Sequence, residues 1–124
     1  ILNLSTKNIT KNDMAFDKWS LNLVNIMNRE GVKIIAGTDT PIGYLTPGFS
    51  LHKELELLSE AGMTNKEVLH SATIAPAEFL NIQNEIGTIE EGKLADLVIL
   101  NQNPLESIKN TQDIYLVIAK GIVQ

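Results

Sequence analysis

Hydrophobic positions first form a regular pattern in residues 13–30. Four large apolar side chains recur there at three- or four-residue spacing: Phe16, Trp19, Leu23 and Met27. This period places them on one face of an amphipathic helix. Asp13 is a candidate N-cap for this helix, and Gly31 is the residue at which we expect it to end.

The next segment, Val32 to Ala36, is short, β-branched and almost continuously apolar. Such a run is typical of a strand that is covered on both faces in a parallel sheet. A helix that leads through one glycine into this strand predicts an αβ unit. Residues 38–48 then contain two prolines and two glycines, which predicts a loop longer than most α/β connections. Long loops of this kind are often functional.

Three helices are predicted after the loop. The first spans residues 50–61, with Ser50 as a candidate N-cap and Gly62 as its stop. Its apolar face is formed by three leucines: Leu51, Leu55 and Leu58. Residues 64–67, with the sequence TNKE, form a capping box ahead of a second helix. A third short helix begins near Pro76, because the first helical turn tolerates proline.

The pattern changes after Leu80. Short apolar and β-branched runs follow, separated by turn-forming pairs at residues 91–92, 103–104 and 120–121. We therefore expect three or four short strands in the last third of the chain.

Composition limits the classes of protein and partner. The chain has 124 residues, 44% of them hydrophobic, which suffices for one compact unit. A net charge of -5 and scattered lysines argue against binding to nucleic acid or an anionic membrane, and no apolar run could span a bilayer. The chain has no cysteine, which excludes disulfides and thiolate metal sites. We expect a soluble protein, with the cytoplasm as the favoured compartment.

Asp39 is the first candidate for chemistry. It follows the predicted strand directly and begins the long loop, and ligands bind at the carboxyl ends of strands in open α/β sheets and in barrels. The alternative is an Asx-turn, in which the carboxylate only hydrogen-bonds nearby backbone N–H groups. The local sequence leaves both interpretations open.

The two histidines are weaker candidates. His52 lies in the first turn of the helix after the loop, where the helix dipole favours the neutral imidazole; it is either an ordinary rim histidine or a ligand-binding one. His70 lies inside a short helix, where we expect a packed structural histidine. Three glutamates are expected on a solvated helix face: Glu54, Glu56 and Glu60. One aspartate and two histidines do not complete a hydrolytic metal centre, and no second catalytic motif is present.

Four blocks of the sequence resemble the C-terminal portion of the metal-dependent amidohydrolase superfamily. They are GVKIIAGTDTP, SLHKELELLSEAGMTNKEVLHSATIAPAEFL, IGTIEEGKLADLVILNQNPLESI and VIAKGIVQ, and they occur in the family's order between residues 16 and 124. The resemblance is to the imidazolonepropionase-like and Xaa-Pro dipeptidase-like members. It implies an α/β fold: residues 13–80 would end a (β/α)8 barrel, and residues 81–124 would supply the C-terminal strands of a small composite β-sandwich.

The resemblance also implies a role for Asp39. In this superfamily the aspartate that ends the last barrel strand binds a divalent metal, by default zinc, and accepts the proton of the water that attacks the substrate. The implied reaction is hydrolysis of a C–N bond in a small cyclic amide or dipeptide-like substrate. His52 would border that substrate. Asp96 and Lys93 lie in the GKLADLV block, which is structural in the family.

The other metal ligands of the family have no counterpart in this sequence. A whole barrel takes about 250 residues, so we expect a C-terminal piece that binds no metal and is inactive by itself. Its unpaired sheet edges predict a homodimer if it folds alone. The alternative is a non-catalytic α/β module, for binding or assembly, that keeps amidohydrolase fold elements.

Overall fold

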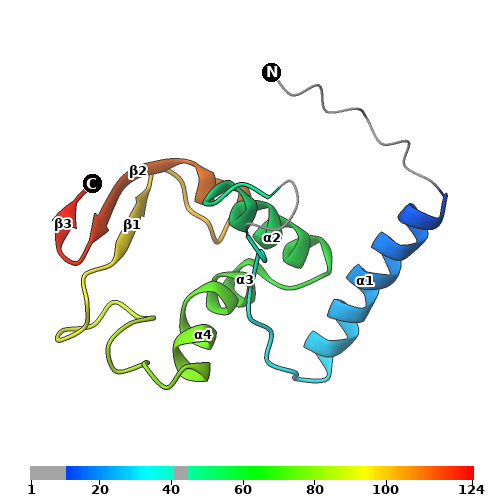
Figure 1. Ribbon diagram of the computed structural model, residues 1–124, viewed down its shortest axis with the longest axis horizontal. Helices are drawn as coiled ribbons and strands as arrows, with labels where there is room; N and C mark the ends of the chain where they lie inside the picture. Colours follow the sequence, from blue (N-terminus) through cyan, green and yellow to red (C-terminus); the bar gives the residue numbers. More distant parts are fainter. Residues whose placement is uncertain (1–10, 41–44) are drawn as a thin grey trace.

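A computed structural model describes residues 11–40 and 45–124 of the chain (Figure 1). Four helices come first, and a small sheet with one 3-10 helix follows. The elements are α1 (Lys11–Arg29), α2 (Phe49–Glu60), α3 (Asn65–Ala72), α4 (Ile74–Phe79), β1 (Leu97–Leu100), η1 (Ile108–Gln112), β2 (Ile114–Ala119) and β3 (Ile122–Val123). None of the helices in the described residues has the length and apolar character needed to cross a membrane.

Helix α1 confirms the predicted amphipathic helix and lies at one side of the molecule (Figure 1). The side-chain amide of Asn25 joins it to the end of α2 through a hydrogen bond of 2.7 Å to the carbonyl oxygen of Ala61. The predicted apolar positions are exposed: Phe16, Trp19, Leu23 and Met27. Asp13 lies inside the helix, so its assignment as N-cap was wrong. The helix ends before Gly31, as predicted, and the glycine has a φ of 77°.

Residues 32–36 do not form a strand, which contradicts the prediction. The segment runs past α3, and the backbone N–H of Ala36 donates a hydrogen bond of 3.0 Å to the carbonyl oxygen of Ser71. Ile34 and Ala36 pack against the core. A β-strand requires a neighbouring strand to complete its ladder, and within the described residues no strand pairs with this segment. Residues 32–36 therefore have the apolar sequence of a strand, but in the part of the chain that the structure describes they form no sheet.

The core lies between α2, α3 and η1. Its buried members are Leu55, Leu58, Met63, Val68 and Ile108. Ser50 does not cap α2: the N-cap is Gly48, and the Ser50 hydroxyl accepts a hydrogen bond of 2.8 Å from the backbone N–H of Thr46. The other helix signals are confirmed, since α2 ends before Gly62, α3 carries the capping box, and Pro76 lies in the first turns of α4.

The last third of the chain forms one antiparallel sheet with the order β1-β2-β3. Three strands agree with the three or four predicted. The β2–β3 turn has positive φ at both Lys120 (51°) and Gly121 (77°), which is typical of tight hairpins. The backbone N–H of Lys120 donates a hydrogen bond of 2.6 Å to the carboxylate of Asp96, which gives Asp96 the structural role expected for it.

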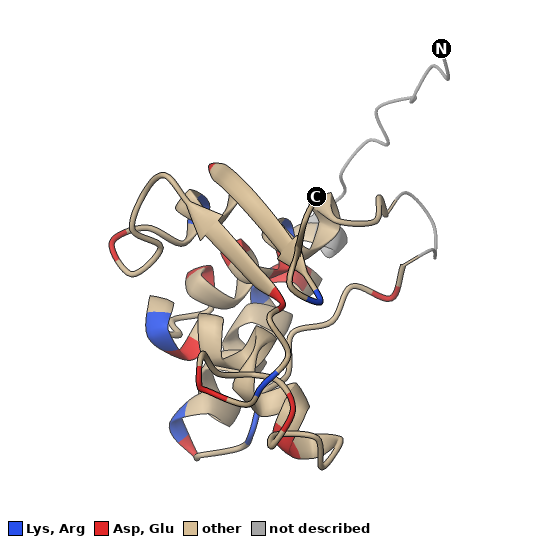
Figure 2. Ribbon diagram, turned by 90° about the vertical axis from the view of Figure 1, so that its left-hand side faces the viewer, with Lys and Arg blue, Asp and Glu red and all other residues tan. Residues whose placement is uncertain are grey.

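Charges lie on the helices and loops, and the strands carry none (Figure 2). Large apolar side chains on the sheet are exposed, among them Val98, Tyr115 and Ile122. The described residues therefore form a small α/β unit with a three-stranded sheet, whose apolar surfaces are only partly covered.

Candidate functional site

Asp39 follows the segment that packs on α3 and is exposed. Its φ of 52° lies in the left-handed region, which is uncommon for residues other than glycine. The flanking threonines hold this turn: the hydroxyl oxygens of Thr38 and Thr40 lie 2.6 Å apart, and the Thr38 hydroxyl also accepts from the backbone N–H of Thr40 at 3.4 Å. The Thr38 side chain thus closes the local turn with the backbone of Thr40.

Glu54 was expected on a solvated helix face and is instead half-buried on α2. Burial raises the pKa of its carboxyl, and a hydrogen bond from the backbone of Gly37 partly opposes this. That bond joins α2 to the chain two residues before Asp39. The sequence contained a signal for this placement, because Glu54 lies three residues after Leu51 and four before Leu58, on the same side of the helix as both.

His52, in the first turn of α2, is partly buried against η1. Its Nδ1 atom lies 3.0 Å from the hydroxyl oxygen of Thr111. That hydroxyl donates a hydrogen bond of 2.8 Å to the carbonyl oxygen of Ile108. The sequence placed His52 at the rim after the loop but gave no sign of a partner 59 residues away.

His70 is exposed, so the expectation of a packed structural histidine was wrong. It borders a hollow of about 560 Å³ between the end of α1, the segment at residues 31–34, and α3. The end of α1 and residues 31–34 line the other sides of this hollow, but they do not bury the His70 side chain. The helical period had placed His70 beside apolar residues, but this period does not show whether another element packs against that side of the helix.

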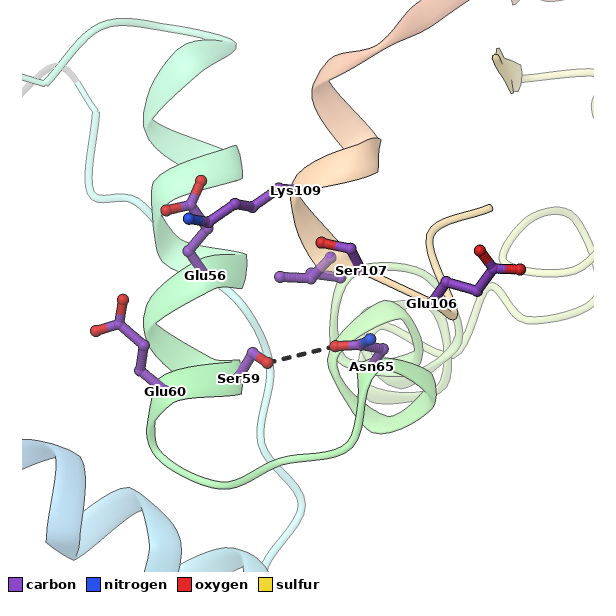
Figure 3. A pocket seen from close by; sticks show the side chains of 8 residues that line it. Glu56, Ser59, Glu60, Asn65, Glu106, Ser107 and Lys109 are labelled. Carbon is purple, nitrogen blue, oxygen red and sulfur yellow. Dashed lines mark hydrogen bonds between the residues drawn. The ribbon is translucent and has the colours of Figure 1, made fainter. Parts of the chain in front are cut away.

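A second, smaller hollow of about 250 Å³ lies between α2 and the η1 segment (Figure 3). Three glutamates and Lys109 line it, and the Ser59 hydroxyl donates a hydrogen bond of 3.3 Å to the Asn65 side chain across its floor. Neither Asp39 nor His52 lines this hollow. This hollow is therefore separate from both candidate residues.

The donor set tests whether this chain could hold a metal. Within residues 11–40 and 45–124, no group of three or more His, Cys, Asp or Glu side chains converges in a way that could bind an ion. A hydrolytic zinc site generally needs three protein ligands. The residues described here therefore do not fit a complete metal centre, and Asp39 could supply only one ligand of such a site.

The chain belongs to the amidohydrolase family, whose family model matches residues 2–123.

Relatives within this family include hydrolases of different kinds. The chain is 35% identical over 78 residues to an imidazolonepropionase of Bdellovibrio bacteriovorus, a match that covers 59% of this chain and 17% of that protein. It is 43% identical over 54 residues to a 5'-deoxyadenosine deaminase of Methanobrevibacter smithii, covering 44% of this chain and 12% of that protein.

A crystal structure of a Xaa-Pro dipeptidase with methionine bound in its active site has a similar fold. The TM-score is 0.75 at 33% sequence identity, over 84% of this chain and 25% of that chain. The described residues thus have the fold of part of an amidohydrolase, as the four sequence blocks predicted. The chain spans a quarter or less of the length of these relatives.

Proposed function

We propose that this chain is the portion of a metal-dependent amidohydrolase that carries the catalytic acid Asp39. The observation that carries the proposal is the position of Asp39 in a chain of this family: it ends the segment packed on α3 and precedes α2. The reaction is hydrolysis of a C–N bond in a cyclic amide or dipeptide-like substrate. The other metal ligands would come from parts of the protein outside these residues.

Asp39 has the chemistry for two tasks. An ionised carboxylate has two oxygens, so one can bind a cation while the other accepts a proton from the attacking water. A divalent metal, by default zinc, would supply a Lewis acid that lowers the pKa of water to about 7. The exposure of Asp39 supports this role, because an exposed carboxylate can be reached by a metal ion and by water.

The substrate class is proposed from the relatives. The imidazolonepropionase and the deaminase are enzymes named for small molecules, and the solved dipeptidase holds an amino acid in its active site. A small amide substrate is consistent with a rim at the start of α2, where His52 lies in the first turn and is partly buried. We assign His52 to the substrate side of that rim.

The test is Asp39→Asn in the full-length protein that carries this chain. We expect hydrolysis to fall by at least about a thousandfold, since both ligation and proton transfer are lost, while the fold survives. Asp17→Asn, which removes the same charge from the exposed face of α1, is the matched control and should keep full activity. Near-normal turnover by Asp39→Asn would overturn the assignment.

A non-catalytic module that keeps amidohydrolase fold elements is the competing function. Metal content separates the two. In the full-length protein we expect stoichiometric metal that Asp39→Asn reduces, and in the 124-residue chain alone we expect none. A full-length protein without metal and without hydrolysis would support the module.

A further inference from the structure

The contact between His52 and Thr111 determines more than the position of a ring. A threonine hydroxyl has one proton to donate and two lone pairs that accept. Thr111 is buried, with 8% of its surface exposed, and its proton goes to the carbonyl oxygen of Ile108 at 2.8 Å. Toward the Nδ1 atom of His52, 3.0 Å away, the hydroxyl can therefore only accept.

The donor and acceptor roles of the Thr111 hydroxyl determine the tautomer of His52. If the Thr111 oxygen accepts, then Nδ1 must carry a hydrogen. In the neutral imidazole the other nitrogen, Nε2, then holds the free lone pair, and in the imidazolium both nitrogens are donors. Any proton or hydrogen bond that the neutral His52 ring accepts from outside therefore arrives at Nε2, whereas the imidazolium accepts neither.

The surroundings of Thr111 hold it in place. The preceding core residue, Ile108, is 6% exposed and packs with Leu55 and Leu58 of α2. On the other side, the side-chain amide of Gln112 donates a hydrogen bond of 2.8 Å to the carboxylate of Glu56, also on α2. Thr111 thus lies between a residue that packs in the core, Ile108, and a residue that is hydrogen-bonded to α2, Gln112. These two contacts fix the Thr111 hydroxyl oxygen relative to α2, the helix that carries His52.

We propose that Thr111 is a positioning residue for His52. It fixes the imidazole as the Nδ1–H tautomer and leaves Nε2 as the acceptor for a hydrogen-bond donor of the substrate, such as an amide N–H. Thr111, in the C-terminal third of the chain, would then determine which imidazole nitrogen of His52 on α2 can accept a hydrogen bond. The substrate part of this inference rests on the proposed function; the tautomer does not.

The tautomer can be measured directly by ¹⁵N NMR of the imidazole nitrogens in the 124-residue chain. The chain has two histidines, so His70→Asn assigns the signals. We expect a protonated Nδ1 and an unprotonated Nε2 for neutral His52. Thr111→Ser, which keeps the hydroxyl, should preserve this pattern, and Thr111→Val should replace it with a mixture of tautomers. Lys109→Ala is the matched control, because it changes an exposed side chain of the same 3-10 helix and should leave the tautomer unchanged.

The same variants test positioning in the full-length protein. Loss of one hydrogen bond to the ring should lower kcat/KM about five- to tenfold in Thr111→Val, and Thr111→Ser should restore it. An unprotonated Nδ1 in the unmodified chain overturns the proposal, and this measurement needs no variant to fold. An unchanged kcat/KM in folded Thr111→Val also overturns it. Failure of the Asp39 assignment would appear separately, as activity in Asp39→Asn with the His52 tautomer intact.

Discussion

Thr64 and Glu67 cap the start of α3 reciprocally. The backbone N–H of Thr64 donates a hydrogen bond of 2.7 Å to the Glu67 carboxylate, and the backbone N–H of Glu67 donates one of 3.3 Å to the Thr64 hydroxyl. Two N–H groups that the helix itself leaves unpaired are thereby satisfied. The bond from the Thr64 backbone is the main reason that the pKa of Glu67 lies below its ordinary value of 4.5.

This cap predicts a loss of stability in acid. Because the pKa of Glu67 is lower in the folded chain, its ionised form stabilises the fold above pH 4.5, and the contribution is lost as the pH falls through the folded-state pKa. Urea unfolding of the unmodified chain and of Glu67→Gln between pH 3 and 7 measures it. The difference in free energy of unfolding should be largest near neutrality and shrink in acid. A difference that does not vary with pH would contradict the prediction.

Glu54 predicts the opposite dependence. Burial raises its pKa, so the folded chain favours the protonated carboxyl, whose contribution is fully present below pH 4.5 and is lost as the pH rises through the folded-state pKa. Relative to Glu54→Gln, the unmodified chain should therefore become less stable from acid toward neutral pH. The same urea experiment tests this, and curves for the two glutamates that bend in the same direction would refute it.

Substitutions at Gly87 and Gly92 can distinguish the cost of backbone strain from the cost of steric overlap. Both have a positive φ, 96° and 91°. A Cβ at Gly92 would meet nothing within 4 Å, whereas one at Gly87 would lie 2.9 Å from the Cβ of Ala77 and 3.2 Å from the carbonyl oxygen of Thr73. We expect Gly92→Ala to cost about 1–2 kcal/mol of unfolding free energy and Gly87→Ala about 1–3 kcal/mol more. If chemical denaturation gives the same loss of unfolding free energy for both variants, the turn after α4 can move to relieve the overlap, and the prediction for Gly87 is wrong.

Features that depend on neighbouring residues were predictable from the sequence. The capping box at residues 64–67 and the turn at residues 120–121 are completed by side chains and φ angles within a few positions. The amphipathic period of α1 is equally local. Such signals do not require the rest of a fold, which is why a piece of a larger protein still displays them.

Features that need distant partners were not predictable. The apolar run at residues 32–36 has a strand's composition, but a strand forms only where another strand completes its hydrogen bonds. The hydrogen bond between Glu54 and the backbone of Gly37 and the contact between His52 and Thr111 both join residues far apart in the sequence. Asp39 was predictable as a candidate because it directly follows an apolar run, which is a local signal. The other ligands of a metal site are not brought together with it in the described residues.

The exposed edge of the sheet predicts self-association of the 124-residue chain. Strand β1 lies at one end of the order β1-β2-β3, and within the described residues no strand pairs with its outer side. Neighbouring residues of a strand point to opposite faces, yet Val98 and Ile99 are 56% and 43% exposed. An unpaired apolar edge of this kind favours pairing with another chain.

We therefore expect the chain to elute as a dimer whose mass, measured by light scattering, falls on dilution. Val98→Lys places a charge on the edge strand and should shift the equilibrium to the monomer by at least about tenfold in dissociation constant, because burying an unpaired charge costs more than about 1.4 kcal/mol. Phe16→Lys, on the exposed face of α1, is the matched control. If Phe16→Lys gives the monomer and Val98→Lys does not, the chains associate through the helix and the edge-pairing prediction is wrong.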